Sequence, residues 1–401
     1  MTEFITKSLG ELTSIMTKGI APKYVEEESN STIVVLNQKC NRDFSISLEQ
    51  SRLNDCNKKA VSPERMLHKY DVLINSTGTG TAGRVAQLFN IPEPMTIDGH
   101  MILIRPTDEI DPIYYGYAVK AHQAEIEMLA EGSTGQTEIN RKRLSSEIMI
   151  SFPVNIESQK QIGELLYQID QKIWTNTAIN DNLFAQARAI AKQWISESTG
   201  DYEMLSLSDT ASINPDTYTP KEEWEYVNYL DTSSITNDYI AEIQCINTSF
   251  EKLPSRARRK LAPNDIVFST VRPNQRHFGI ISKPLPNMLG STGFAVIRSK
   301  NPLVCNELIY LCLTENEFVE KMQQLAEQST STFPSIKPSD LGVCEIPCPK
   351  DDSSMSFTET LKSMFALIAE NQRESTYLAD MRDALLPKLM SGEIDVFGIQ
   401  L

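Results

Sequence analysis

The segment that comes nearest to a catalytic motif is a loop rich in glycine and threonine, Gly78-Thr-Gly-Thr-Ala-Gly83-Arg84-Val85. A phosphate-cradling loop has the pattern GxxxxGK[ST], in which the lysine contacts phosphate and the hydroxyl binds magnesium. Arg84 and Val85 stand at those two positions here, and the matching segment later in the chain, Val271–His277, contains no glycine. A nucleotide site is therefore disfavoured, which leaves a loop that contacts DNA phosphates or a plain turn between strands.

Other catalytic signatures are missing from the sequence as well. Methyl transfer to DNA would need a glycine-rich cofactor loop and an [ND]PP[YF] tetrad, which Asn214-Pro-Asp-Thr does not match. Neither HExxH nor GxSxG occurs. The four histidines and seven cysteines are scattered without a CxxC pair, which fits reduced thiols in a cytosol. We expect no catalytic residue, no metal site and no cofactor in this chain.

Basic residues gather in one part of an otherwise acidic chain. Between Lys252 and Lys283 there are eight Lys or Arg and one acid, a net +7 that leaves −22 elsewhere in a chain of net charge −15. Binding to a polyanion depends on where the positive charge sits, so the acidic total does not exclude it. Arg suits bidentate contact with guanine and Asn or Gln with adenine, while Lys and Arg attract phosphate.

We therefore predict DNA contacts from both halves of the chain, although a solvated surface charge remains the alternative for each residue alone. In the second half the candidates are Arg256, Arg258, Arg259, Lys260, Arg272, Asn274, Gln275, Arg276, His277 and Lys337. In the first half they are Lys58, Lys59, Arg65, Lys69, Ser76, Thr77, Thr79, Arg84, Gln136, Arg141, Lys142 and Arg143.

The elements that must position these residues occur twice, because the chain repeats itself. The segment Leu67-His-Lys-Tyr-Asp71 aligns with Leu261-Ala-Pro-Asn-Asp265 at an offset of 194, and an apolar strand follows each. At nearly the same offset, Leu36-Asn37 matches Leu230-Asp231 and Ile104-Arg105 matches Ile297-Arg298. The segment Ile148–Pro153 likewise matches Glu345–Pro347. Several matches in one order indicate two copies of one module.

Each copy has the pattern of a mixed α/β module, which we place at residues 1–154 and 199–350. Short β-branched runs predict strands. The expected strands are Ile33–Asn37, Asp71–Ser76, Arg84–Phe89 and Met101–Arg105 in the first copy, and Val227–Leu230, Asp265–Val271, Phe278–Ser282 and Phe294–Arg298 in the second. A helical pattern follows each set, near Tyr117–Glu131 and Glu307–Glu327.

A long amphipathic stretch follows each module, at residues 155–198 and 351–401. Alternating steps of four and three mark a 3.5-residue repeat from Ile162 to Trp194, and the same steps run from Phe357 to Leu389, every position 195 residues later. Such a repeat is typical of a coiled-coil seam. Asn176 and Asn371 fall at equivalent positions, where a buried asparagine fixes register. We expect the helices to pair as an antiparallel coiled coil, giving a pseudo-two-fold tandem repeat, with Pro387 loosening the last turn.

Taken together, these features make the chain resemble the specificity subunit of type I restriction–modification enzymes over essentially its whole length. The resemblance rests on the two-copy layout and on four segments, which are Tyr70–Val85, Gly132-Ser-Thr-Gly-Gln136, Ile150–Ile162 and Leu385–Ile394. It implies two target-recognition domains on an antiparallel helix pair, each domain recognising one half of a split double-stranded DNA target. The second copy departs from the pattern, since Ser329–Lys337 replaces the glycine-rich segment.

The resemblance also implies partners. Two methyltransferase subunits would dock on the helices and methylate adenine with S-adenosylmethionine, and restriction subunits that use ATP and magnesium could join them. The amino-terminal residues lack a secretory pattern and no stretch is apolar enough to span a membrane, so we expect a cytoplasmic protein. The alternatives are a stand-alone DNA-binding regulator and a coiled-coil adaptor without modification partners.

Overall fold

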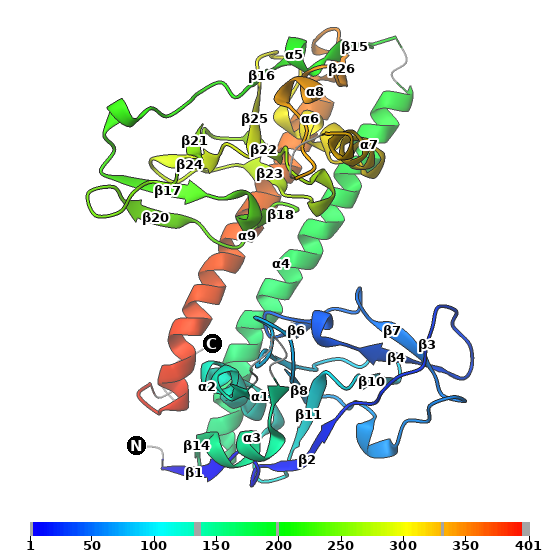
Figure 1. Ribbon diagram of the computed structural model, residues 1–401, viewed down its shortest axis with the longest axis vertical. Helices are drawn as coiled ribbons and strands as arrows, with labels where there is room; N and C mark the ends of the chain where they lie inside the picture. The colour runs from blue at the N-terminus through cyan, green and yellow to red at the C-terminus, as the bar shows by residue number, and fades with distance from the viewer. Residues whose placement is uncertain (1–2, 132–137, 198–199, 330–332, 395–401) are drawn as a thin grey trace. The chain divides into compact units, whose positions relative to one another are not determined.

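The computed structural model describes residues 3–131, 138–197, 200–329 and 333–394, and these residues divide into two compact units (Figure 1). The first unit is Met1–Trp174 with Ser375–Leu401, and the second is Thr175–Glu374. Two long helices, α4 (Ile156–Glu197) and α9 (Met355–Met390), cross this division, so each unit holds one module and part of both helices. The four-part division expected from the sequence stays a prediction.

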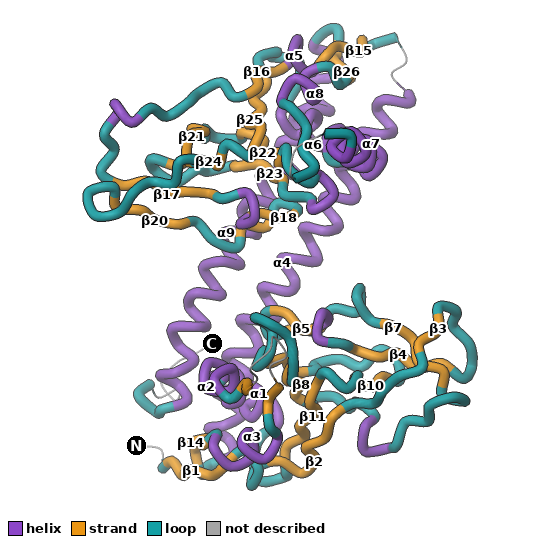
Figure 2. Tube along the Cα trace, in the orientation of Figure 1, coloured by secondary structure: helices purple, strands orange, loops and turns teal. Residues whose placement is uncertain are grey.

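Three layers make up the first unit: helices, a central sheet and an outer sheet (Figure 2). The central sheet has the antiparallel order β2 (Thr13–Lys18), β11 (Met101–Pro106), β8 (Val72–Asn75), β9 (Val85–Gln87). The outer sheet has the order β10 (Met95–Ile97), β4 (Thr32–Leu36), β7 (Arg52–Asp55), β3 (Tyr24–Val25), with β10 and β4 parallel. Three short pairs complete it, β1–β14 (Phe4–Ser8, Met149–Pro153), β5–β6 (Asn41–Arg42, Ser45–Ile46) and β12–β13 (Ala130–Glu131, Glu138–Ile139). The short helices are α1 (Pro112–Ala121), α2 (Gln123–Met128) and α3 (Arg141–Glu147).

The second unit repeats this plan. Its central sheet has the order β16 (Ala211–Ile213), β25 (Phe294–Ser299), β22 (Asp265–Ser269), β23 (Phe278–Ile281). Its outer sheet has the order β20 (Gln244–Asn247), β17 (Tyr226–Leu230), β24 (Met288–Ser291), β21 (Ala257–Lys260), with β17 and β24 parallel. The remaining elements are β15–β26 (Tyr202–Ser206, Glu345–Pro349), β18–β19 (Ile235–Thr236, Tyr239–Ile240), α5 (Leu207–Thr210), α6 (Asn306–Leu313), α7 (Asn316–Glu327) and α8 (Pro338–Gly342). The fourth strand of the outer sheet joins opposite edges in the two units, β3 beside β7 but β21 beside β24.

All eight strands expected from the sequence are present within one or two residues of their predicted ends. Each central strand is buried on both faces: Val72 and Ile74 of β8 face the helices, while Leu73 faces the outer sheet. In β22, Ile266 and Phe268 likewise face the helices, while Val267 faces the outer sheet. The helical stretches expected near Tyr117–Glu131 and Glu307–Glu327 are present, but each consists of two helices, and they begin at Pro112 and at Asn306. The breaks fall at His122 and at Thr314–Glu315, where capping geometry ends one helix and starts the next.

The predicted seams of the long helices are buried or half-buried at every one of their positions. In the second unit Asn371 donates from Nδ2 to Oδ1 of Asn180 at 2.8 Å, and Asn180 donates to the carbonyl of Ile368 at 3.2 Å. Asn176 donates to the backbone carbonyl of Asn371 at 3.4 Å. The side chain of Asn371 thus bonds to Asn180, and its backbone bonds to the equivalent Asn176. Helix α9 continues through Pro387 and ends three residues later. No helix among the described residues is long and apolar enough to cross a membrane.

Equivalent tyrosines in the two units, Tyr117 and Tyr310, lie in the core and each donates a hydrogen bond to a carboxylate. Around Tyr117 the acid is Asp170 of α4, at 2.6 Å, and an aromatic ring comes from Phe44 of the β5–β6 turn, with centroids 4.8 Å apart. Around Tyr310 the acid is Asp238 of the β18–β19 turn.

The aromatic ring beside Tyr310 comes from Phe365 of α9, with centroids 5.8 Å apart. In the repeat, Phe44 corresponds to Asp238 and Asp170 corresponds to Phe365. Phenylalanine and aspartate have thus exchanged places between turn and long helix.

Enclosure of the Asp238 carboxyl makes the stability of the second unit depend on pH. Burial raises the pKa of Asp238 to about 6, although the hydrogen bonds from Tyr310 and from the amide of Ile280 act in the opposite direction and lower it. Between about pH 4 and pH 6 the folded state then keeps a proton that the unfolded state has lost, so the free energy of unfolding falls as pH rises. As pH rises from 4 to 7, the free energy of unfolding of Asp238→Asn should increase relative to that of the native protein by up to about 3 kcal/mol. Urea unfolding at each pH measures this difference. The exposed Asp43→Asn is the control, and a pH-independent difference would contradict the assignment.

Candidate nucleic-acid interface

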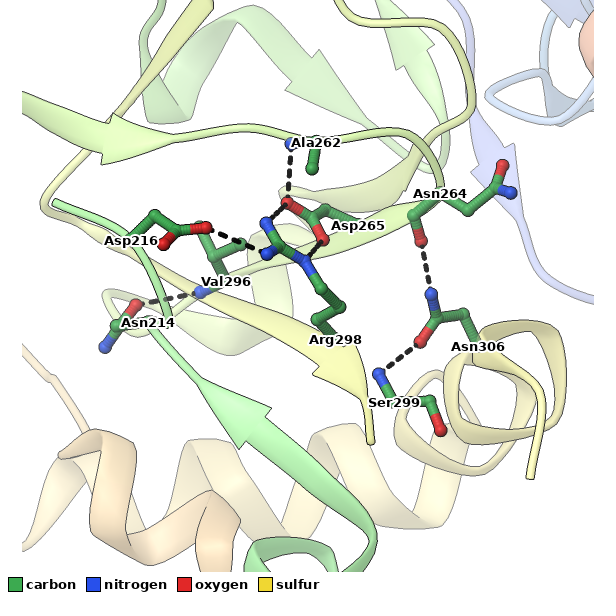
Figure 3. Close-up of polar contacts among 9 residues, drawn as sticks. All are labelled: Asn214, Asp216, Ala262, Asn264, Asp265, Val296, Arg298, Ser299 and Asn306. Atoms are coloured by element: carbon green, nitrogen blue, oxygen red, sulfur yellow. Dashed lines mark hydrogen bonds and ion pairs between the residues drawn. The ribbon is translucent and has the colours of Figure 1, made fainter. Parts of the chain in front are cut away.

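The residues that define the sequence repeat form a buried ion pair in each unit. Arg105 holds Asp71 through two hydrogen bonds of 2.7 Å, and the amide of His68 donates to the same carboxylate at 2.7 Å. In the second unit Arg298 holds Asp265 at 2.7 and 2.9 Å (Figure 3). Both aspartates are at most 1% exposed. The shared residues therefore serve the scaffold, since they fix the turn that precedes β8 or β22.

Further polar contacts brace the second copy of this scaffold. Figure 3 shows Asn214 accepting from the amide of Val296 at 2.9 Å, and Asn306 at the start of α6 accepting from the amide of Ser299 at 2.8 Å. Asn306 also donates to the carbonyl of Asn264 at 2.8 Å. These bonds tie β25, α6 and the turn before β22 together. The loop that leaves the far end of β22 therefore starts from a fixed strand.

That loop, residues 270–277, carries five of the predicted DNA contacts. Its backbone is held on one side by residues 333–336, since Arg272 donates to the carbonyl of Pro334 at 2.9 Å and Ile336 donates to that of Thr270 at 2.9 Å. Arg272 and Arg276 both adopt left-handed backbone angles, with φ of 47° and 56°, which non-glycine residues seldom do. The surrounding contacts hold this conformation in place.

The side chains of the loop point in a defined arrangement. The Arg272 guanidinium lies 5.1 Å from the ring of Phe333, a residue that sequence reasoning missed. Arg276 donates to Asn316 at 2.8 Å, and His277 Nδ1 lies 2.6 Å from the carbonyl of Ile235 in the β18–β19 hairpin. Asn274 and Gln275 are exposed. Arginine, amide and aromatic groups thus share one surface, which has the donor types that suit base edges and phosphates.

The loop at the same place in the first unit, residues 76–84, joins β8 to β9. Gly78, Gly80 and Gly83 all have positive φ, and a Cβ on Gly83 would lie 2.4 Å from the side chain of Glu127. The loop leads into a strand, whereas a phosphate-cradling P-loop leads into a helix, so the nucleotide interpretation loses its structural context. Arg84 donates to the carbonyl of Gly80 at 3.2 Å and so braces the loop from within.

Neighbouring segments pair with the two loops in the same manner. Thr77 forms a bridge with Glu138 in the first unit, as Val271 does with Ser335 in the second. Lys18, a residue that sequence reasoning also missed, pairs with Glu138, and Arg141 lies near Lys18. Burial and the charge of Arg141 lower the pKa of Lys18, whose ammonium forms an ion pair with Glu138.

Other predicted residues are less suited to DNA in this conformation. Ser76 is fully buried, so its hydroxyl does not reach the surface. Arg143 is bound by Glu147 at 2.6 and 2.8 Å and also by Glu131, and Lys260 is bound by Glu222. Burial lowers the pKa of Arg259. These side chains are therefore either buried or already paired with carboxylates of the protein, and so are less available to DNA.

The remaining candidates are distributed over other surfaces. Arg256 lies near the loop at 270–277. Its carbonyl accepts from the amide of Thr292, and the carbonyl of the adjacent Gly293 accepts from the amide of Thr270 at the start of that loop. Arg258 lies in the edge strand β21. In the first module Lys58, Lys59 and Lys69 lie in turns or bends, and Arg65 ends a short 3-10 helix. Lys58 pairs with Asp55 at 3.4 Å, and Lys69 lies 4.7 Å from the ring of Tyr70. Thr79, Lys142 and Lys337 are exposed, and Gln136 lies outside the described residues.

A cavity of about 560 Å³ in the second unit lies beside α9. Its lining includes Asp238, Glu307, Lys362 and Gln372 but none of the predicted DNA contacts. Within the described part of the chain, no group of three or more His, Cys, Asp or Glu side chains could hold a metal ion. In each unit, predicted residues therefore gather on one loop, residues 76–84 in the first and residues 270–277 in the second.

Comparison with known proteins identifies relatives of this architecture. Residues 1–184 match the model of the type I restriction modification DNA specificity domain. The HindI specificity subunit of Haemophilus influenzae is 24% identical over 159 residues, which span 40% of this chain and only 34% of that relative. The MjaIX specificity subunit of Methanocaldococcus jannaschii is 23% identical over 327 residues, covering 76% of this chain and 74% of the relative.

A solved structure shares the fold. The S subunit of the type I restriction–modification system from M. genitalium superposes with a TM-score of 0.57 at 17% identity, over 97% of this chain and 96% of that one. Its similarity thus extends through both modules and both long helices. Residues 1–184 thus match the DNA specificity domain of type I restriction–modification systems, and the chain is similar in sequence to specificity subunits of those enzymes.

Proposed function

We propose that the chain is the DNA-recognition subunit of a type I restriction–modification enzyme and catalyses no reaction itself. Each module would recognise one half of a bipartite double-stranded target. The observation that carries this proposal is the contrast between loops and scaffold. Loops at one topological position, 76–84 and 270–277, differ in sequence, while the ion pairs that precede them are the same. Two unlike loops on two like scaffolds suit two unlike half-targets.

The long helices would set the gap between the half-targets as an antiparallel coiled coil. Contacts inside each unit support this, since Asp170 of α4 pairs with Arg382 of α9 in the first, and Phe184 of α4 with Phe365 of α9 in the second. Later residues of α4 therefore meet earlier residues of α9. At 1.5 Å per residue, the 42 residues of α4 extend about 60 Å.

The chemistry would come from partners in the cytoplasm. Two methyltransferase subunits would dock on the helices and use S-adenosylmethionine, and restriction subunits that consume ATP with magnesium could join them. Affinity purification from the host tests this assembly against a stand-alone regulator or an adaptor. Methyltransferase subunits recovered at two per chain would support it. A lone chain that binds its target tightly without them would contradict it.

The loop at 270–277 yields a direct prediction about binding. Arg272→Ala with Arg276→Ala should abolish specific binding, because one or two bidentate base contacts are each worth about 1–3 kcal/mol. Assembly with the methyltransferase subunits should be unaffected, since neither side chain lies on a long helix. Fluorescence anisotropy with target DNA and gel filtration of the complex measure the two properties.

Arg373→Ala provides a matched control for this double variant, because Arg373 is a half-exposed arginine of the same unit that pairs with Glu370 on α9. It should retain specific binding. Normal methylation of the original target by the loop variant would refute the proposed interface.

The spacer hypothesis predicts a change in target geometry. One heptad added to both α4 and α9 at matched positions should widen the gap by about 10 Å, or roughly three base pairs. The same insertion in α4 alone should abolish activity, because the two seams then lose register. Methylation assays on a DNA library with varied gaps give the readout, and an unchanged preferred gap in the doubly lengthened protein would overturn the hypothesis.

A further inference from the structure

One layer of the helix pair differs in chemistry between the two units. In the first unit Arg382 Nη1 lies 2.5 Å from Asp170 Oδ1, with side chains 13% and 2% exposed. Position 170 corresponds to Phe365 in the repeat, and position 382 corresponds to Ala187. Both counterparts are buried in the apolar core of the second unit. An ion pair in one unit therefore takes the place of an apolar pair in the other.

The distribution of these four residues over the two helices has a consequence for pairing. Helix α4 carries Asp170 and Ala187, and α9 carries Phe365 and Arg382. When α4 packs against α9, aspartate pairs with arginine in the first unit, while phenylalanine and alanine belong to one apolar cluster in the second. If α4 packed against a second α4 in the same register, each Asp170 would face an alanine. If α9 packed against a second α9, each Arg382 would face a phenylalanine.

Both homotypic pairings would separate the two charges: each Asp170 would keep only the hydrogen bond from Tyr117, and each Arg382 would keep only the exposed Asp383 of its own helix. Removing one partner of a buried ion pair is strongly destabilising, because the remaining charge keeps its desolvation penalty without the attraction. Neighbouring layers do not discriminate in this way. Leu166 with Leu386 in the first unit corresponds to Leu361 with Ala191 in the second, and every combination of these side chains is apolar.

We propose that this layer selects the partner of each long helix: α4 accepts α9 and rejects a second copy of α4. The proposal concerns pairing between chains and does not depend on the proposed function in DNA recognition. It has a physical use during synthesis, since α4 leaves the ribosome before α9 exists. A symmetric seam would let the exposed α4 of one nascent chain pair with that of another, a common failure of repeat proteins.

Moving one arginine between the helices tests the proposal without changing the composition. In the variant Ala187→Arg with Arg382→Ala, the new arginine at position 187 faces Asp170 of a second chain, while pairing within one chain leaves both charges unmatched. The full-length variant should therefore form a dimer, with twice the native mass in light scattering, whereas the native protein should be a monomer. A monomeric variant with the native melting temperature would overturn the proposal.

A second variant keeps the test decisive if the rearranged chain does not fold. Replacing a buried ion pair by apolar side chains is often neutral for stability, so Asp170→Leu with Arg382→Leu should fold when Tyr117→Phe also removes the hydroxyl that donates to Asp170. Its helices no longer discriminate, so two differently tagged copies expressed together should capture each other at least several-fold more than native copies do. Equal capture for variant and native protein would refute the selective role of the ion pair.

Discussion

The burial of one side of two very long helices is the constraint on which this structure depends. Helices of 42 and 36 residues do not persist in water through propensity alone, so tertiary contacts must stabilise them along their length. In the first unit Ile162 and Leu166 of α4 and Leu389 of α9 belong to the same apolar cluster as Val72 and Ile104 of the central sheet. Module and helices thus share one core, and the orientation of the sheet is fixed to the helices that carry it.

A second consequence concerns the division between constant and variable parts. The buried pairs Asp71–Arg105 and Asp265–Arg298 recur with nearly the same geometry. Beyond the strands that they fix, the loops differ in length, glycine content and charge. Loops on a rigid scaffold can change their side chains at little cost in stability, and recognition residues usually lie on such loops. The glycine loop (residues 76–84) and the arginine loop (residues 270–277) are thus two different loops on the same scaffold.

Much of this architecture is predictable from the sequence because apolar periodicity reports burial directly. The central strands and both seams follow from it, and the recurrence of Asp71 and Arg105 follows from matching the two halves of the sequence. What periodicity does not report is long-range pairing. The β1–β14 pairing and the exchange of Phe44 and Asp170 for Asp238 and Phe365 depend on contacts between distant segments. The split of each predicted helix arises from local capping at His122 and Thr314.

The candidate surface was predictable in part for a related reason. Charge density located the arginine loop, and Arg272 and Arg276 lie on it. Charge alone does not separate such residues from basic side chains that are already neutralised, such as Arg143 beside Glu147. Phe333 and Lys18 carried no local signal, since an isolated aromatic or lysine is common on any surface. Their place beside the loops comes from strand pairing that the sequence does not encode locally.

Mapping DNA methylation would show whether two unlike modules recognise two halves of one target. Single-molecule sequencing of the host genome, with this gene intact and deleted, gives the measurement. We predict methylated adenines in two different half-sequences at one fixed separation, and we predict that this methylation disappears on deletion. An unchanged methylation pattern after deletion, or a single uninterrupted target, would contradict it.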